Sequence, residues 1–294
     1  MELITKIEEI TPQLFEECDQ KGTMEYFEYE TVSYEGKPFT KHGYVYLPYG
    51  YDKEKKYEIL YLIHGGGETA EKYLYEGGEE NKLKRAIDNL IKEKVVKPFI
   101  VVTPSPYPYH EPMGPEANVW PFISHFPKEL TEDCIPVVEA KYHTYADFDV
   151  SAESLQKVRE HRKVMGWSMG ARTTWNIFVQ RLNYFHDIAT LSGSYATYKE
   201  PDNKEWAHEV ASTVDKMVKD QGYGADDFTL TALTGSDDTA YVKLALQMSA
   251  LTGYEKEFDF YDKRNTVFLV WPGGQHHTQW RLQYIINVIK QFYK

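Results

Sequence analysis

The sequence predicts an α/β fold built on a mostly parallel, mixed sheet with helices on both faces. Short apolar runs, typical of strands covered on both faces, alternate along most of the chain with segments of helical periodicity. Before them, the N-terminal part alternates apolar and polar residues, as strands exposed on one face do. The 294 residues contain no internal repeat and no linker composition, so we expect a single domain over residues 1–294.

The elements can be placed in order along the chain. Residues 1–22 are expected to form an N-terminal extension or a helix, and two exposed strands follow at 24–34 and 41–50, joined by a turn around residues 36–38. The predicted buried strands lie at 57–63, 99–104, 163–167, 188–193, 228–235 and 266–273. The predicted helices cover 79–95, 128–141, 169–183, 203–220, 239–252 and 279–293. Ligands of such sheets bind at the carboxyl ends of the strands, so the residues after each strand are the candidates for chemistry.

Composition narrows the function classes. The formal net charge of −12 argues against a nucleic-acid or anionic-membrane partner, because those surfaces require clustered Lys and Arg, and it suits a neutral substrate. No apolar run approaches membrane-spanning length. Residues 1–20 are acidic and amphipathic rather than a secretory signal, so we expect a cytoplasmic protein, or a secreted one if a signal has been removed. Two cysteines, Cys18 and Cys134, exclude a disulfide scaffold.

Ser168 is the candidate nucleophile, because it stands in the spacing Gly166-x-Ser168-x-Gly170. A buried strand precedes it and good helix formers follow it, which is the setting of a nucleophile elbow. Such a turn strains the serine backbone and brings strand and helix so close that side chains at positions 166 and 170 would collide. A five-residue pattern also arises by chance, so an ordinary strand-to-helix connection is the alternative.

Three glycines follow His64, directly after the strand at 57–63. They leave backbone N–H groups uncovered, and a loop of this kind supplies one of the two oxyanion donors in serine hydrolases. The expected donors are Gly66, or Gly65 in its place, and Met169, whose N–H lies at a helix N-terminus that favours negative charge. A glycine-rich turn without a ligand is the alternative.

Two later strands each end beside a pair of candidates, Asp237 and Asp238 after the first and His276 and His277 after the second. A triad needs a carboxylate that orients a histidine and a histidine that acts as general base for the serine. Either aspartate suits the first role or caps the next helix. Adjacent histidines point in different directions, so at most one reaches Ser168. No HExxH pattern or zinc-type cysteine pair is present, so no metal site is expected.

The order serine, acid, histidine is that of α/β-hydrolases. With these residues in place, the sequence resembles carbohydrate esterase family 1, an α/β-hydrolase family, and especially the feruloyl esterase domains of bacterial xylanases. The matching stretches span about residues 40–294 and read YLIHGGGE, VVTPSPY, FPKELTEDCIPVVEAKYHTYA, GWSMGARTTW, LSGSYA, LTGSDDTAY and PGGQHHTQWRLQYI. The resemblance places the family's serine at Ser168, its acid at Asp238 rather than Asp237, and its histidine at His276 rather than His277.

Four residues are assigned to substrate binding. Tyr107 and Trp120 lie in the long, proline-rich stretch 104–127, which we interpret as the rim of the site. Tyr195 follows another strand end, and His64 is expected to brace the oxyanion loop. The same stretch also contains the aromatic residues Tyr109, Phe122 and Phe126. Tyr198 is a further candidate for an aromatic wall of the pocket.

The resemblance implies a serine esterase that hydrolyses acyl esters of plant cell-wall carbohydrate such as xylan through an acyl-enzyme, without a cofactor. The partner is an acylated carbohydrate or a small-molecule ester, with no nucleic acid and no membrane. In the feruloyl esterases an aromatic residue is expected after LSGxY, where this chain has Ala196. The acyl group is therefore feruloyl, cinnamoyl or acetyl. A small-molecule carboxylesterase, an acyltransferase and a non-catalytic carbohydrate-binding relative are the alternatives.

Overall fold

The structure is a computed structural model that describes residues 2–76, 79–108, 118–195, 202–261 and 265–294. Its main sheet has eight strands in the order β1-β2-β6-β3-β7-β8-β9-β10. The strands are β1 (Thr23–Val32), β2 (Pro38–Leu47), β3 (Ile59–Ile63), β6 (Ile100–Pro104), β7 (Arg162–Trp167), β8 (Asp187–Leu191), β9 (Thr229–Gly235) and β10 (Thr266–Trp271). β2 pairs antiparallel with both β1 and β6, and every other pairing in this sheet is parallel. The predicted mixed α/β sheet is confirmed.

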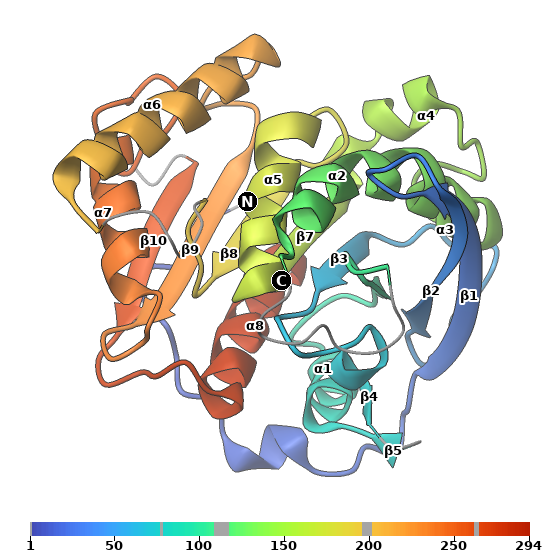
Figure 1. Ribbon diagram of the computed structural model, residues 1–294. Helices are drawn as coiled ribbons and strands as arrows, with labels where there is room; N and C mark the ends of the chain where they lie inside the picture. Colours follow the sequence, from blue (N-terminus) through green and yellow to red (C-terminus); the bar gives the residue numbers. More distant parts are fainter. Residues whose placement is uncertain (1, 77–78, 109–117, 196–201, 262–264) are drawn as a thin grey trace.

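Helices cover both faces of the sheet (Figure 1). They are α1 (Lys82–Lys92), α2 (Trp120–Glu129), α3 (Ile135–Lys141), α4 (Ala152–Lys157), α5 (Met169–Arg181), α6 (Lys204–Asp220), α7 (Tyr241–Leu251) and α8 (Thr278–Tyr293). In Figure 1, β1 and β2 form one edge of the sheet, whereas α6 and α7 lie beside β9 and β10 at the other. The buried side chains form two large clusters, one with α1 and α8 and the other with α2, α3, α5, α6 and α7.

The central strands are buried on both sides because successive side chains point to opposite faces. In β3, Ile59, Tyr61 and Ile63 join the cluster under α5, while Leu60 and Leu62 join the cluster under α1 and α8. This double burial explains why their sequences read as unbroken apolar runs. β1 instead alternates buried and exposed residues from Phe27 to Val32, as expected for a strand with one face in water.

The structure differs from the sequence prediction over residues 120–127, which were assigned to a proline-rich loop and form most of α2. Pro121 lies in the first helical turn, where its missing N–H is not needed for the helix. Pro127 lies inside the helix, which continues through a π-helical turn at Leu130–Cys134 into α3. The small two-stranded sheet of β4 (Tyr75–Glu76) and β5 (Glu79–Glu80) was also not predicted, nor was α4.

The N-terminal segment lies against α8 and, apart from a short 3-10 helix at Pro12–Phe15, carries no helix between residues 2 and 22. Backbone N–H groups of this segment donate to amide side chains spaced four residues apart on one stripe of α8. The pairs are Ile4 with Gln291, Glu8 with Asn287 and Ile10 with Gln283. Cys18 and Cys134 are both buried free thiols. Within the part of the chain that the structure describes, no helix is both long enough and apolar enough to cross a bilayer.

Candidate active site

Three of the predicted side chains lie in one chain of hydrogen bonds at the carboxyl edge of the sheet. The Ser168 hydroxyl lies 2.8 Å from Nε2 of His276, and Nδ1 of His276 lies 2.8 Å from Oδ1 of Asp238. A carboxylate only accepts, so Nδ1–H donates to Asp238 and Nε2 is free to accept the Ser168 proton. Ser168 directly follows β7, and His276 and Asp238 lie in the loops after β10 and β9, so the parallel sheet brings together residues distant along the chain.

The geometry distinguishes the members of each adjacent pair. The Asp238 side chain is fully buried, whereas Asp237 is exposed and accepts a hydrogen bond from Ser236. Asp238 Oδ1 also accepts the Ala240 N–H at 2.7 Å, so one aspartate both caps the turn before α7 and holds the histidine. Both contacts, which the sequence left open to either aspartate, are thus made by Asp238. His277 is exposed and caps α8 through its ring nitrogen.

Ser168 has the strained backbone expected of an elbow, with φ 60° and ψ −117°. A positive φ outside glycine costs on the order of 1–3 kcal/mol and persists only where the surroundings enforce it. Here the Ser168 N–H donates to the Leu191 carbonyl of β8 at 2.8 Å, and α5 begins at the next residue. The hydroxyl is consequently presented at the edge of the sheet, above the first turn of α5.

The two flanking glycines allow the elbow to close. A methyl group on Gly166 would lie 2.3 Å from the Gly170 carbonyl oxygen, and one on Gly170 would lie 2.2 Å from the Ile63 carbonyl oxygen. Both clashes are with backbone atoms, which cannot rotate away. The predicted collision of side chains at these positions is thus explained by the contact of α5 with β7 and β3.

Replacing Gly170 with alanine is expected to reduce the free energy of unfolding by about 3 kcal/mol or more, because the new methyl group overlaps the β3 backbone. The loss can be measured by urea denaturation. Gly224→Ala is the matched control, since its nearest neighbouring atom lies 3.6 Å away and its φ is not in the left-handed region. Equal stability of the two variants would contradict this account of the elbow.

In the glycine loop after β3, Gly65 and Gly66 are the alternative candidates for one oxyanion donor, and their contacts differ. The Gly65 N–H already donates to Oε2 of Glu68 at 2.9 Å, so it is not available to a substrate. Gly66 lies against the first residue of α5, since a methyl group built on it would lie 3.0 Å from Cγ of Met169. Gly66 therefore lies next to Met169, the residue that follows Ser168. Gly66 and Met169 remain the predicted pair of amide donors to an oxyanion.

His64 lies beneath this loop and is completely buried. Its Nδ1 lies 2.9 Å from the Gly65 carbonyl oxygen and its Nε2 lies 2.8 Å from the Ser105 hydroxyl. The carbonyl can only accept, so Nδ1 carries the proton and Nε2 accepts from Ser105. The bond to the Gly65 carbonyl fixes the peptide plane that carries the Gly66 N–H. His64 thus braces the loop as expected, whereas its burial does not suit the substrate contact also assigned to it.

Burial lowers the pKa of His64 to about 4, so the side chain is neutral in the folded protein. In the unfolded chain it takes up a proton near pH 6.5. The stabilisation is complete above that pH and is lost as the pH falls toward 4, by about 3 kcal/mol in all. We expect His64→Gln to remove this part of the pH dependence of the free energy of unfolding, measured by urea denaturation between pH 7.5 and 4.

The control for that measurement is His208→Gln, which changes an exposed histidine on α6. It should keep the pH dependence of the unsubstituted protein. A His64→Gln variant that loses stability with the same slope as the parent would show that His64 is not the buried neutral group.

Aromatic residues of the predicted rim gather beside the elbow. Tyr107, Ile123 and Met169 form a small buried cluster, and Trp120 packs against it from the first turn of α2. The Tyr195 N–H donates to Gln247 on α7, and the Tyr195 hydroxyl lies 3.7 Å from the Met217 sulfur on α6. The role of Tyr195 in substrate binding stays a prediction. Met169 thus connects the nucleophile directly with Tyr107 and Trp120. Tyr109, Ala196 and Tyr198, to which the sequence analysis also assigned roles, lie outside the described residues.

Three residues near the triad were not predicted from the sequence: Trp167, Arg281 and Glu68. Trp167 stacks on the His276 imidazole with ring centroids 4.4 Å apart and an angle of 24° between the planes. The guanidinium of Arg281, on α8, lies 5.4 Å from the Trp167 ring centroid and forms an ion pair with Glu68. Although burial opposes its charge, Tyr73 and Glu68 raise the pKa of Arg281. The sequence offered one signal for these residues, which is that Trp167 stands immediately before Ser168.

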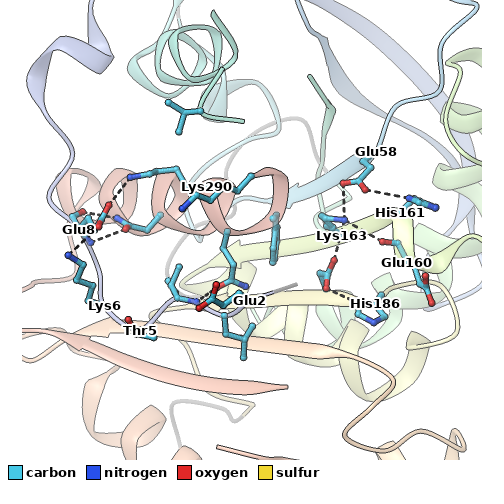
Figure 2. A pocket seen from close by; sticks show the side chains of 18 residues that line it. Glu2, Thr5, Lys6, Glu8, Glu58, Glu160, His161, Lys163, His186 and Lys290 are labelled. Carbon is cyan, nitrogen blue, oxygen red and sulfur yellow. Dashed lines mark hydrogen bonds and ion pairs between the residues drawn. The ribbon is translucent and has the colours of Figure 1, made fainter. Parts of the chain in front are cut away.

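A cavity of about 830 Å³ lies at the amino ends of the parallel strands, away from Ser168 (Figure 2). It is lined by the N-terminal segment, the end of α8 and the first residues of β7 and β8. Among its charged residues, Lys163 pairs with Glu58 at 3.1 Å and with Asp187 at 3.2 Å. Lys163 is the second residue of β7, the strand that ends before Ser168, so roughly 17 Å of extended chain separates Lys163 from Ser168. The cavity is therefore no part of the Ser168 site.

Comparisons with known proteins show the family to which the chain belongs. The model of the Esterase family matches residues 40–290. The chain is similar to endo-1,4-beta-xylanase Y of Acetivibrio thermocellus, with 34% identity over 264 residues, 89% of this chain and 23% of that protein. It is also similar to an endo-1,4-beta-xylanase/feruloyl esterase of Xylanibacter ruminicola, with 32% identity over 167 residues, 55% of this chain and 20% of that protein. The chain thus spans about a quarter or less of the curated relatives it matches.

Among solved structures, the chain is similar to a serine-to-alanine mutant of the feruloyl esterase module from Clostridium thermocellum, complexed with sinapinate. The identity is 29% and the TM-score 0.82, with 100% of this chain and 95% of that chain covered. A CE1 ferulic acid esterase from Anaeromyces mucronatus, in complex with ferulic acid, matches with 19% identity and a TM-score of 0.66, over 96% of this chain and 95% of that one. The second likeness bears on the fold alone.

Proposed function

Since the chain belongs to the Esterase family, we propose that it is a serine esterase that hydrolyses feruloyl-type esters of plant cell-wall xylan. The observation that carries the proposal is the continuous hydrogen-bonded chain from Ser168 through His276 to Asp238. A serine hydroxyl is a weak nucleophile unless a base takes its proton as it attacks. His276 is within reach of that proton, and Asp238 holds the imidazole in the required tautomer.

The reaction proceeds in two halves. His276 removes the Ser168 proton while the serine oxygen attacks the ester carbonyl, which forms a tetrahedral intermediate with a negative oxygen. His276 then gives that proton to the departing sugar oxygen, and the acyl group remains on Ser168 as an ester. A water molecule, deprotonated by His276, attacks this acyl-enzyme and releases the carboxylic acid. The serine recovers its proton, so no other reactant is consumed.

The backbone N–H groups of Gly66 and Met169 stabilise the negative oxygen in both halves. Each donor contributes on the order of 3 kcal/mol, because it is fixed in place before the charge develops. Met169 is the first residue of α5, so the partial positive charge of the helix N-terminus acts in the same direction. The loop fixed by His64 supplies the second donor. Neither step calls on a metal or an organic cofactor.

Two observations support an aromatic acyl group. The feruloyl esterase module similar to this chain is complexed with sinapinate, and the second curated relative bears the name feruloyl esterase. In this chain Tyr107 and Trp120 cluster with Met169, so aromatic surface adjoins the serine from which the acyl group extends. The small residue Ala196 after LSGSY favours an acetyl esterase as the second candidate, because it offers no aromatic wall at that position.

Steady-state kinetics on three substrates separate these functions: methyl ferulate, 4-nitrophenyl acetate and acetylated xylan. We expect kcat/KM for methyl ferulate to exceed that for release of acetate from xylan by about a hundredfold or more, since an aromatic acyl group fills an aromatic pocket. A preference for acetylated xylan would overturn the feruloyl assignment but not the esterase. Ser168→Ala provides the blank for every substrate.

A further inference from the structure

We propose that Glu68, held by Arg281, is a positioning residue that fixes the oxyanion loop and links it to the ring stack beneath His276. The inference rests on the proposed esterase function and concerns residues outside the triad and its two amide donors. Glu68 follows the glycine loop after β3, whereas Arg281 lies in the first turns of α8, just beyond His276. The pair thus joins two segments that each carry part of the site.

The contacts of Glu68 divide between its two carboxylate oxygens. Oε2 accepts the Gly65 N–H at 2.9 Å, and Oε1 pairs with a guanidinium nitrogen of Arg281. His64 meanwhile holds the Gly65 carbonyl from the other side. Both peptide planes of Gly65 are therefore fixed, although glycine by itself adopts many backbone conformations. The direction of the Gly66 N–H follows from these two bonds.

Arg281 also reaches the triad through aromatic rings. Its guanidinium carbon lies 4.8 Å from the Tyr73 centroid and 5.4 Å from the Trp167 centroid. Trp167 in turn stacks on His276, and a methyl group on Gly65 would touch the Trp167 ring at 3.0 Å. Trp167 thus contacts both the His276 imidazole and the Arg281 guanidinium, and the Glu68 carboxylate connects the guanidinium to the oxyanion loop.

Charge adds a second reason for the pair. A carboxylate two residues from Gly66 opposes the negative charge that develops on the substrate oxygen. The Arg281 cation neutralises Glu68, and both side chains are largely buried, with 10% and 19% of their surfaces exposed. Removing Arg281 alone leaves an unpaired carboxylate beside the oxyanion, whereas removing both charges does not. A link that only holds the fold together would make this distinction in the stability of the variants and not in the kcat of the folded proteins.

The test compares kcat and KM for methyl ferulate among Glu68→Ala, Arg281→Gln and the double variant Glu68→Gln/Arg281→Gln. We expect Glu68→Ala to lower kcat by about tenfold or more with KM changed less than about twofold, since the loop acts mainly in the transition state. We expect Arg281→Gln to be slower than the double variant, because a glutamine at 68 still accepts the Gly65 N–H without the charge. Thermal unfolding is followed for each protein.

Lys290→Gln is the matched control, because it breaks an ion pair with Glu8 near the far end of the same helix. Its kcat should equal that of the parent. A folded Glu68→Ala variant with parental kcat, or a double variant no faster than Arg281→Gln, would overturn the positioning role. If Glu68→Ala does not fold, the comparison of the last two variants decides. Parental activity in Ser168→Ala would instead reject the proposed function itself, so the two failures are distinguishable.

Discussion

Replacing Ser168 with alanine is expected to lower kcat on methyl ferulate by about a million-fold, because no other group then forms the acyl-enzyme. The hydroxyl makes one hydrogen bond, to His276, among the described residues, so its loss should leave the fold intact. Steady-state kinetics with a cooperative thermal unfolding transition check both parts. Activity within about a hundredfold of the parent in the folded variant would reject Ser168 as nucleophile.

His276→Ala should reduce kcat by a similar factor, and combining it with Ser168→Ala should cause little further loss, since the two residues act as a unit. The neighbouring histidine offers a matched control. His277 is exposed and directed at the N-terminus of α8, so His277→Ala should retain kcat close to that of the parent. Inactivity of His277→Ala with a normal His276→Ala would reverse the assignment.

Asp238→Asn is expected to lower kcat by about ten-thousand-fold with KM little changed. The amide presents an N–H₂ group to His276, which favours the tautomer with its proton on Nε2, the wrong nitrogen for accepting from Ser168. Because the side chain is fully buried and also caps the Ala240 N–H, stability should be followed in parallel.

Asp237→Asn changes the adjacent, exposed carboxylate and leaves the His276 contact untouched, so kcat should stay within about twofold of the parent. Comparing kcat of Asp238→Asn with kcat of Asp237→Asn separates two effects: the loss of the contact that orients His276, and the loss of one negative charge from the loop after β9. A loss of equal size in the two variants would mean that local negative charge, rather than the contact with His276, matters.

Much of the fold could be predicted because burial on both faces leaves a clear signal. Strands such as β3 are apolar throughout, and each helix between them has its own periodicity. Prediction was wrong at residues 120–127, where Pro121 and Pro127 indicated a loop although both are accommodated in α2. Propensity is a weak prior that packing overrides, and α2 packs against α5.

The site was predicted as far as it depends on position after a strand. Ser168, Asp238 and His276 each follow one, so the parallel sheet alone brings them near each other. Glu68 also follows a strand, but its partnership with Arg281 could not be predicted, because the ion pair joins residues 213 positions apart. Likewise, the tautomer of His64 depends on which atoms surround a buried ring, and a sequence contains no record of that.

The central claim is that Ser168 forms a covalent acyl-enzyme, and peptide mass spectrometry tests it most directly. The protein is mixed with 4-nitrophenyl ferulate, quenched in acid within the first turnover and digested. We expect a feruloyl group on the peptide that contains Ser168, and none on the corresponding peptide of the Ser168→Ala variant. A feruloyl group on another residue would contradict a covalent acyl-enzyme at Ser168. So would release of nitrophenol in the first turnover while Ser168 stays unmodified.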